Sequence, residues 1–343
     1  MYNFTNDYNE TVHPELLKAV TSTTNQKIKG YGLDDYCTKS KESIKQQLQS
    51  PNADIHFMPG GTITNLTVIS HILKPYQAII AANSGHVNVH ETGAIEATGH
   101  KVLTVKTEDG KLTPELIEEM LIFHCDEHMV QPKLVYISNT TELGTIYTKQ
   151  ELREIYQFCQ KKHLYLYLDG ARLAMALAAT ENDISFPDLA KYTDIFYIGG
   201  TKVGTFLGEV VVFNNTTISK DFRFSMKQKG AILAKSWIVA VQMNALMQNN
   251  LYLELGRHSN NMAEKLKTIF ENAGLTFAFK PQSNQLFVNF PNNLVKKILS
   301  NYSVDNLGAM GIGYTCLRFC TSWATQEDEI QTLAKYLKGV IDI

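Results

Sequence analysis

The chain has 343 residues, of which 44% are hydrophobic and 19% are charged, and its formal net charge is −2. This composition is typical of a globular protein with one large and one smaller domain, and it excludes a low-complexity or disordered chain. The near-neutral charge gives no argument for a nucleic-acid partner, and no apolar stretch reaches the roughly 18 residues that span a bilayer.

The amino-terminal sequence MYNFTNDYNE lacks the basic and apolar regions of a signal peptide, so we expect a cytoplasmic protein that does not bind membranes. Its five cysteines are scattered, odd in number and without a CxxC pair. This pattern favours reduced thiols over a disulfide framework.

Apolar runs alternate with helical patterns through the middle of the chain, which predicts βαβ units on a mainly parallel sheet. Such sheets bind ligands at the carboxyl ends of their strands. Helices are expected at 62–73, 113–123 and 149–162, the last two opened by threonines that can cap a helix. Strands are expected at 54–58, 78–82, 100–105, 133–138, 164–168, 194–199 and 208–213.

The pattern changes after Phe213, where a polar stretch leads into a long helical region over 233–272 that is interrupted near Asn249-Asn250. Strands near 275–279, 285–289 and 314–320 and a terminal helix at 326–337 then indicate an α+β unit. We therefore predict a large α/β domain over 17–248 and a small α+β domain over 249–343, with residues 1–16 packing on the small one.

The first candidate ligand site follows the strand 54–58, where Pro59-Gly-Gly-Thr62 begins a helix. Free backbone N–H groups and the positive end of the helix dipole make such a turn a seat for phosphate, to which Gly61, Thr62 and Asn65 contribute. Alone, this motif also fits an ordinary strand-to-helix turn. The second phosphate partner is expected among three lysines, of which we favour Lys235 over Lys227 and Lys229.

A second candidate segment, Ser84-Gly-His86 to Glu91, follows the strand 78–82. His86 is expected to stack on the face of a flat ligand. His86 and His90 are also spaced as a helical pair beside Glu91, which is an alternative metal-binding pattern, but the HExxH order is absent and we predict no metal.

Two further strands end in residues that together indicate pyridoxal phosphate. Lys202 lies in the glycine-rich turn Ile198-Gly-Gly-Thr-Lys-Val-Gly204 and can form a Schiff base with the cofactor. Asp169 can keep the pyridine nitrogen protonated, which an asparagine could not do. Arg172 can hold a substrate carboxylate or the region of the cofactor's phenolic oxygen.

With these motifs the chain resembles the L-threonine aldolase and β-eliminating lyase group of fold-type I pyridoxal phosphate enzymes, over nearly its whole length. The resemblance implies a homodimer or homotetramer with sites at subunit interfaces, where Tyr31 or Lys235 reaches a neighbour's cofactor, and Tyr31 is a candidate substrate contact. Its carriers are Tyr31-Gly32, Pro59–Thr62 with Asn65, Ser84–His86 with Glu91, Asn139-Thr140, Leu168–Arg172, Gly200–Lys202 and Leu317–Phe319.

Residue by residue, the resemblance implies that Lys202 binds the cofactor covalently, that Asp169 pairs with its ring nitrogen, and that Gly61, Thr62 and Lys235 hold its phosphate. Arg172 and Arg318 would bind the substrate carboxylate, with Cys316 and Cys320 on the same strand face as Arg318.

The chain departs from the family pattern at three places. Asn6-Asp7 stands where the family has Ser-Asp, which leaves Asn6 as a candidate substrate contact, and Thr141 replaces a histidine after the Asn-Thr pair. An arginine expected shortly before Lys235 is absent, with Ala234 nearby.

The predicted activity is cleavage of L-threonine or L-allo-threonine into glycine and an aldehyde such as acetaldehyde. His86 is the candidate base, directly or through water and oriented by Glu91, and a purely stacking role is equally open. One alternative is a pyridoxal phosphate β-eliminating lyase or aminotransferase, which uses the same lysine but cleaves Cα–H. Another is a cofactor-storing protein without turnover.

Overall fold

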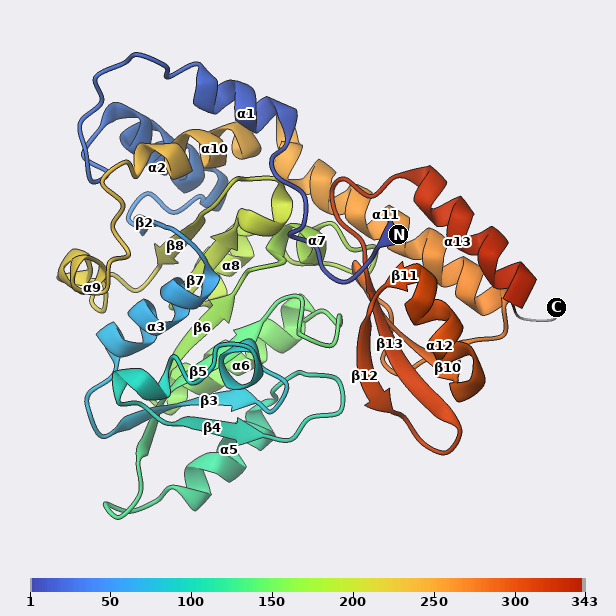
Figure 1. The fold of residues 1–343 in the computed structure, drawn as a ribbon. Helices are drawn as coiled ribbons and strands as arrows, with labels where there is room; N and C mark the ends of the chain where they lie inside the picture. The colour runs from blue at the N-terminus through green and yellow to red at the C-terminus, as the bar shows by residue number, and fades with distance from the viewer. Residues whose placement is uncertain (1, 341–343) are drawn as a thin grey trace.

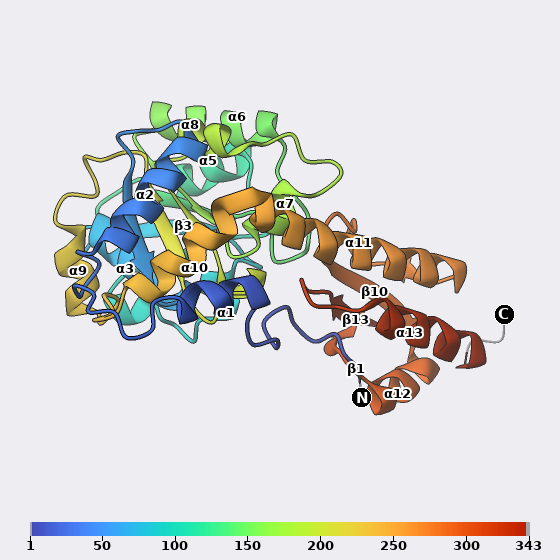
Figure 2. The same ribbon diagram turned by 90° about the horizontal axis from the view of Figure 1, so that it is seen from above.

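The computed structural model describes residues 2–340, which form two lobes connected by the long helix α11 (Leu251–Asn272) (Figures 1 and 2). The first turns of α11 belong to the core of the large lobe, and its last turns belong to the core of the small lobe. The interruption expected near Asn249-Asn250 is confirmed, because both asparagines have positive φ and separate α10 (Trp237–Met247) from α11.

The large lobe is built on a seven-stranded sheet in the order β2-β8-β7-β6-β5-β3-β4. Neighbouring strands are parallel except at β8, which runs antiparallel to both β2 and β7. The predicted mainly parallel sheet is therefore confirmed, with all seven expected strands. They are β2 (Asp54–Met58), β3 (Gln77–Ala82), β4 (Val102–Val105), β5 (Gln131–Ser138), β6 (Tyr165–Asp169), β7 (Ile195–Gly199) and β8 (Glu209–Phe213).

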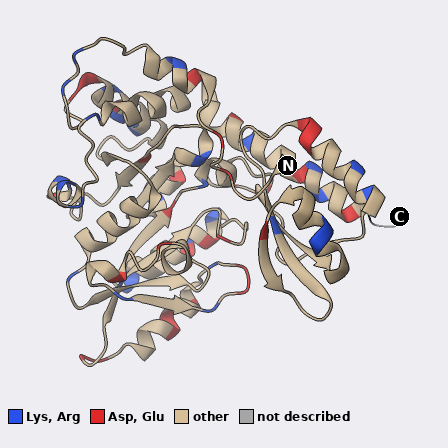
Figure 3. Ribbon diagram, viewed as in Figure 1, with Lys and Arg blue, Asp and Glu red and all other residues tan. Residues whose placement is uncertain are grey.

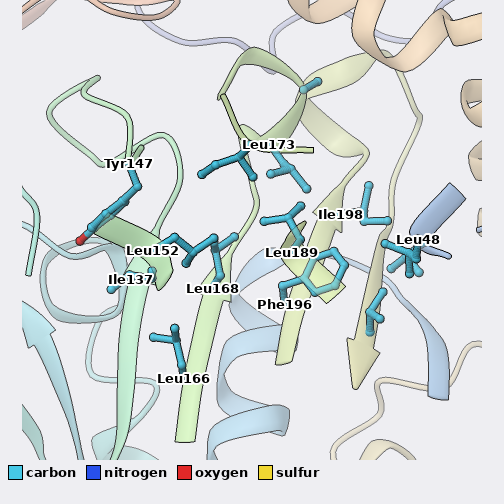
Figure 4. Close-up of a cluster of buried hydrophobic side chains, with 14 of the residues drawn as sticks. Leu48, Ile137, Tyr147, Leu152, Leu166, Leu168, Leu173, Leu189, Phe196 and Ile198 are labelled. Atoms are coloured by element: carbon cyan, nitrogen blue, oxygen red, sulfur yellow. The ribbon is translucent and has the colours of Figure 1, made fainter. Parts of the chain in front are cut away.

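Both faces of this sheet are covered, which explains why its strands read as nearly continuous apolar runs. Successive residues of a strand point to opposite faces, so Tyr167 packs on one side of β6 while Leu166 and Leu168 pack on the other. Figure 4 shows the second side, where side chains of β6 and β7 meet those of surrounding helices, including Leu48, Leu173 and Leu189.

Helices of the large lobe divide between the two faces. One face carries α3 (Gly61–Ile72), α4 (His86–Val89) and α9 (Phe222–Gln228). The other face and its edges carry α1 (Pro14–Thr21), α2 (Asp35–Leu48), α5 (Pro114–Phe123), α6 (Lys149–Lys161), α7 (Leu173–Leu177), α8 (Phe186–Tyr192) and α10. The predicted threonine caps are confirmed, since Thr113 accepts from Leu116 N and Thr148 from Glu151 N. Three short 3₁₀ helices complete the lobe: Glu96–Thr98, Thr201–Val203 and Gln248–Asn250.

The small lobe is an antiparallel sheet in the order β12-β13-β10-β9, covered by helices. An α+β arrangement was predicted here, although the helix and two strands over 292–309 were not. The elements are β9 (Thr276–Phe277), β10 (Gln285–Pro291), α12 (Asn292–Asn301), β11 (Tyr302–Ser303), β12 (Asp305–Ala309), β13 (Tyr314–Cys320) and α13 (Glu327–Val340).

The amino-terminal segment crosses from the small lobe to the large one. Its strand β1 (Tyr2–Asn3) pairs with β11, and Phe4 packs in the small lobe's core. Further on, His13 N donates to Gly204 O at 2.8 Å and α1 packs on the large lobe. Residues 1–16 were expected to pack on the small domain; residue 1 lies outside the described residues, and the others are shared between the lobes.

Positions of basic and acidic residues are interspersed along the ribbon of both lobes (Figure 3). Within residues 2–340, no helix is both long and apolar enough to cross a membrane.

Candidate active site

The carboxyl ends of the large-lobe strands meet at one edge of the sheet, and a cavity of about 330 Å³ lies there. Because β8 runs in the opposite direction, its first residue, Glu209, reaches the same edge. The cavity is lined by Tyr8, Pro59, Gly60, Gly61, Thr62, His86, His90, Ala171, Tyr197, Thr201, Lys202, Phe206, Leu207 and Glu209.

Lys202 enters the cavity from the 3₁₀ turn that follows β7. The turn is tightly packed, since a Cβ on Gly199 would come within 2.6 Å of Ala171 O and one on Gly200 within 2.6 Å of Gly208 O. Glycine is therefore required there. The Lys202 ammonium lies 5.9 Å from the centre of the Tyr8 ring, so an amine stands in the cavity beside an aromatic wall.

Glu209 holds this lysine-bearing turn. Its carboxylate accepts from Gly200 N and from Thr201 Oγ1, each at 2.7 Å. Burial raises the pKa of Glu209 to about 7, against the opposing effects of these hydrogen bonds and of the Lys202 charge. Sequence reasoning missed Glu209; the available signal was a single acid at the start of the otherwise apolar run Glu209–Phe213.

Asp169, the last residue of β6, is only 3% exposed. Its Oδ2 accepts from Tyr136 Oη at 2.5 Å and from Asn65 Nδ2 at 3.1 Å, and its Oδ1 accepts from Ala171 N at 2.9 Å. Burial opposes its charge, but His86 and these hydrogen bonds outweigh that effect and lower the pKa of Asp169. The site therefore holds a buried, ionised carboxylate.

His86 begins the short helix α4, and its Nδ1 lies 2.7 Å from Glu91 Oε1. Burial lowers the pKa of His86, but the Glu91 hydrogen bond and the charges of Glu142 and Asp169 raise it overall. The His90 ring lies 5.4 Å from that of His86. Within residues 2–340, no three His, Cys, Asp or Glu side chains are grouped as metal ligands.

Asn65, expected at the phosphate seat, is instead turned toward the sheet, because it lies on the buried face of α3. Its Oδ1 accepts from Tyr167 Oη at 2.8 Å. Its Nδ2 donates to Glu91 Oε1 at 2.7 Å and to Asp169 Oδ2 at 3.1 Å. Asn65 thus connects the His86–Glu91 pair to Asp169.

The amino terminus of α3 does face the cavity, with Gly60, Gly61 and Thr62 on its wall. No side chain caps this helix end, so its backbone N–H groups are oriented for an anion. Neither Tyr31 nor Lys235 belongs to the described lining of the cavity. Tyr31 N donates to Ala234 O at 2.9 Å, which holds the two segments together at an exposed surface.

That surface is apolar, with Phe224 76% exposed and Tyr31 44% exposed. The two aromatic residues line a hollow of about 380 Å³ together with Arg223, Lys227 and Ile232. The Lys227 ammonium lies 4.5 Å from the centre of the Tyr31 ring.

Arg172 follows β6 and is already paired within the protein. Its Nε donates to Asp7 Oδ2 at 2.7 Å and its Nη2 to Asp7 Oδ1 at 3.1 Å, while its Nη1 lies 3.8 Å from Glu142 Oε2. Burial opposes the charge of Asp7, but Arg172 and Lys202 keep the pKa of Asp7 well below its usual value. Sequence reasoning assigned no partner to Arg172, because Asp7 lies far away in the chain.

Arg318 lies on β13 and forms an ion pair with Asp305. It also donates to Thr5 O and Gln285 Oε1, each at 3.3 Å. On the same strand, burial raises the pKa of the Cys316 thiol to about 11 and that of Cys320 to about 12, so both thiols stay neutral. Nearby, the side chain of Asn6 accepts from Tyr8 N at 3.1 Å.

Replacing Asp7 with alanine should lower the free energy of unfolding by about 3 to 5 kcal/mol, because a buried guanidinium loses its partner. Chemical denaturation measures this change. Asn6→Ala is the matched control: it removes one local hydrogen bond of the same segment and should cost about 1 kcal/mol or less. Equal losses in both variants would contradict a stabilising role for the Asp7–Arg172 pair.

Comparison with known proteins gives four findings. The model of the β-eliminating lyase family matches residues 12–292. A structure of the threonine aldolase of Leishmania major is 45% identical, with a TM-score of 0.97, over 99% of this chain and 100% of that one. The low specificity L-threonine aldolase of Pseudomonas aeruginosa is 27% identical over 98% of this chain and 97% of that protein. A Thermus thermophilus aspartate aminotransferase, 14% identical with a TM-score of 0.74, shares the fold alone.

Proposed function

The chain belongs to the β-eliminating lyase family, and we propose that it is a pyridoxal phosphate-dependent carbon–carbon lyase that cleaves L-threonine or L-allo-threonine into glycine and acetaldehyde. Its relatives in Leishmania major and Pseudomonas aeruginosa carry the name threonine aldolase. The observation that carries the proposal is the meeting of Lys202, the buried anion Asp169 and an uncapped helix end at one edge of the sheet.

The side chains at this edge fit pyridoxal phosphate by their chemistry. Lys202 supplies the amine for covalent attachment, Asp169 supplies the anion that a protonated ring nitrogen requires, and the start of α3 supplies N–H donors for the phosphate. A cavity of about 330 Å³ suits a ligand of this size. When bound, the cofactor withdraws electrons from the substrate's Cα and so weakens the bonds at that carbon.

His86 is the residue we propose to take the proton from the substrate's β-hydroxyl, directly or through one water. Its Nδ1 is engaged by Glu91, which leaves Nε2 as the nitrogen available for this transfer. The Glu91 carboxylate then stabilises the imidazolium that forms. The same ring can stack on the cofactor, so both roles are compatible with its position on the cavity wall.

The substrate carboxylate is proposed to bind Arg172 and Arg318. Both guanidinium charges act on the pKa of His90, which supports their lying near the cavity wall that His90 helps to form. Arg172 would use Nη1, since Asp7 occupies its other edge. In this arrangement Asp7 holds the guanidinium in one orientation. Asn6 precedes Asp7 and accepts a hydrogen bond from Tyr8, which lines the cavity, and this supports Asn6 as a further substrate contact.

We also propose a homodimer or homotetramer in which Lys235 completes the phosphate site of a neighbouring copy and Tyr31 reaches the cofactor and substrate of that copy. The exposed apolar surface around Phe224 and Tyr31 supports this assembly, because such patches are usually covered by a partner.

The two sheets support a division into a cofactor-binding domain over 17–248 and a small domain over 249–343. The cytoplasmic location stays a prediction.

Product analysis tests the proposed function. Purified protein loaded with pyridoxal phosphate should release acetaldehyde and glycine in equal amounts from L-threonine and L-allo-threonine. Ammonia with a 2-oxo acid would instead identify a β-eliminating lyase, and amino transfer to an added 2-oxo acid would identify an aminotransferase. Cofactor binding without any of these products would indicate a storage protein.

A further inference from the structure

One amide separates two buried carboxylates in this site. Asn65 is 1% exposed, and its Nδ2 donates to Glu91 Oε1 at 2.7 Å and to Asp169 Oδ2 at 3.1 Å. Because both oxygens contact the same nitrogen, they lie within about 6 Å of each other. Two buried carboxylates this close share a proton unless donors compensate both charges.

The carbonyl oxygen of the Asn65 amide also has a hydrogen-bond partner, on the side away from the two acids. Tyr167 Oη donates to Asn65 Oδ1 at 2.8 Å, which turns the NH₂ group toward the acids. An NH₂ group has two hydrogens, so it can donate one to each carboxylate. The Asn65 side chain is therefore matched to a pair of anions.

Glu91 depends on this amide more than Asp169 does. Asp169 also receives hydrogen bonds from Tyr136 and from Ala171 N. Glu91 is engaged by Asn65 and His86 through the same oxygen, Oε1, and its other oxygen is buried without a hydrogen-bond partner among residues 2–340. Without Asn65, the Glu91 carboxylate would lose a donor. We expect the Glu91–Asp169 pair then to take up one proton and share it between the two carboxylates.

We propose that Asn65 is a positioning residue that keeps Glu91 and Asp169 charged at the same time, and that it thereby determines how strongly His86 holds its proton. The inference rests on the proposed function for the importance of His86 and Asp169 to catalysis. It assigns Asn65 a task other than binding phosphate.

Among the described residues, the titratable groups that act on His86 include Glu91 beyond α4, Asp169 on β6, Glu142 after β5, and His90 at the end of α4. The first three favour the protonated ring. Discharging one carboxylate of the Glu91–Asp169 pair removes part of that attraction. His86 must then lose its proton at a lower pH.

The test is the titration of His86 by NMR in the full-length protein loaded with pyridoxal phosphate, with its signal assigned from the His86→Gln variant. In Asn65→Leu, the midpoint should fall by about one pH unit. The matched control is Tyr167→Phe, which removes a hydrogen bond from the same network. Both N–H donors should stay in place in this variant, because the two carboxylates accept only from the NH₂ end of the amide. Its midpoint should stay within about 0.2 units of the parent value.

An unchanged midpoint in Asn65→Leu, or equal changes in both variants, would overturn the proposal. If Asn65→Leu does not accumulate as folded protein, Asn65→Thr provides the same test, because its one hydroxyl can donate to only one carboxylate. It should lower the midpoint by about half as much, and no change would again overturn the idea. The titration needs no turnover, so its outcome is independent of whether acetaldehyde is released from threonine.

Discussion

The Lys202→Ala variant is expected to lose threonine cleavage, with kcat reduced at least about 10³-fold, because the covalent attachment of the cofactor is lost. Lys202 is the lysine on the described wall of the cavity, and Glu209 holds its turn through Gly200 and Thr201. An alanine there leaves the turn and its glycines intact. The variant should therefore fold and bind pyridoxal phosphate without a covalent bond.

Two measurements check this expectation. Borohydride reduction followed by mass spectrometry should attach the cofactor to the parent protein at residue 202 and leave the variant unmodified. Lys191→Ala is the matched control, since Lys191 is an exposed lysine on the helix that leads into β7. It should retain both attachment and activity. Attachment to another lysine in Lys202→Ala, with activity preserved, would refute the assignment.

The Asp169→Asn variant should lose about 10²- to 10⁴-fold in kcat/KM, because removing one partner of a buried ion pair costs about 3 to 5 kcal/mol. Asparagine keeps the volume of the side chain but cannot supply the charge that a protonated ring nitrogen needs. It also places an NH₂ group where Tyr136, Asn65 and Ala171 now donate to oxygens.

The matched control for this variant is Asp194→Asn. Asp194 is also a buried acid that accepts from a backbone group, Leu166 N, at 2.8 Å, but it precedes β7 and so lies at the opposite end of the strands. Both substitutions should lower stability, whereas only Asp169→Asn should change the absorbance of the bound cofactor and the rate. Equal kinetic losses in the two variants would show that general destabilisation explains the effect.

The central sheet could be predicted from the sequence because strands that are buried on both faces are continuous apolar runs. Strands such as Ile195–Gly199 are apolar at every position, and their ends carry the residues that chemistry needs. Helix α2 was missed because most of its residues are polar, and only a narrow stripe including Cys37, Ile44 and Leu48 contacts the core. Local composition does not show which surface a neighbouring segment will cover.

Site residues that directly follow strands could be predicted from the sequence. Contacts between these residues and side chains from distant segments could not. The positions of Lys202, Asp169 and His86 at one edge follow from parallel strand order. Arg172 pairs with Asp7, and Asn65 contacts Asp169. In each pair the two residues are more than 100 positions apart in the sequence. Residue types and spacing contain no information on such contacts.

The path of the amino-terminal segment has a consequence for the order of events during synthesis. Residues 2–4 leave the ribosome about 300 residues before their backbone partners at Ser303 and Cys320. Asp7 likewise accepts a hydrogen bond at 2.9 Å from Asn284, which is synthesised much later. The large sheet can form while translation continues, yet the wall that Asp7 and Arg172 build is completed only after the small lobe emerges. Nascent chains halted before residue 284 should therefore contain the lysine and the ring acid but lack a finished substrate pocket.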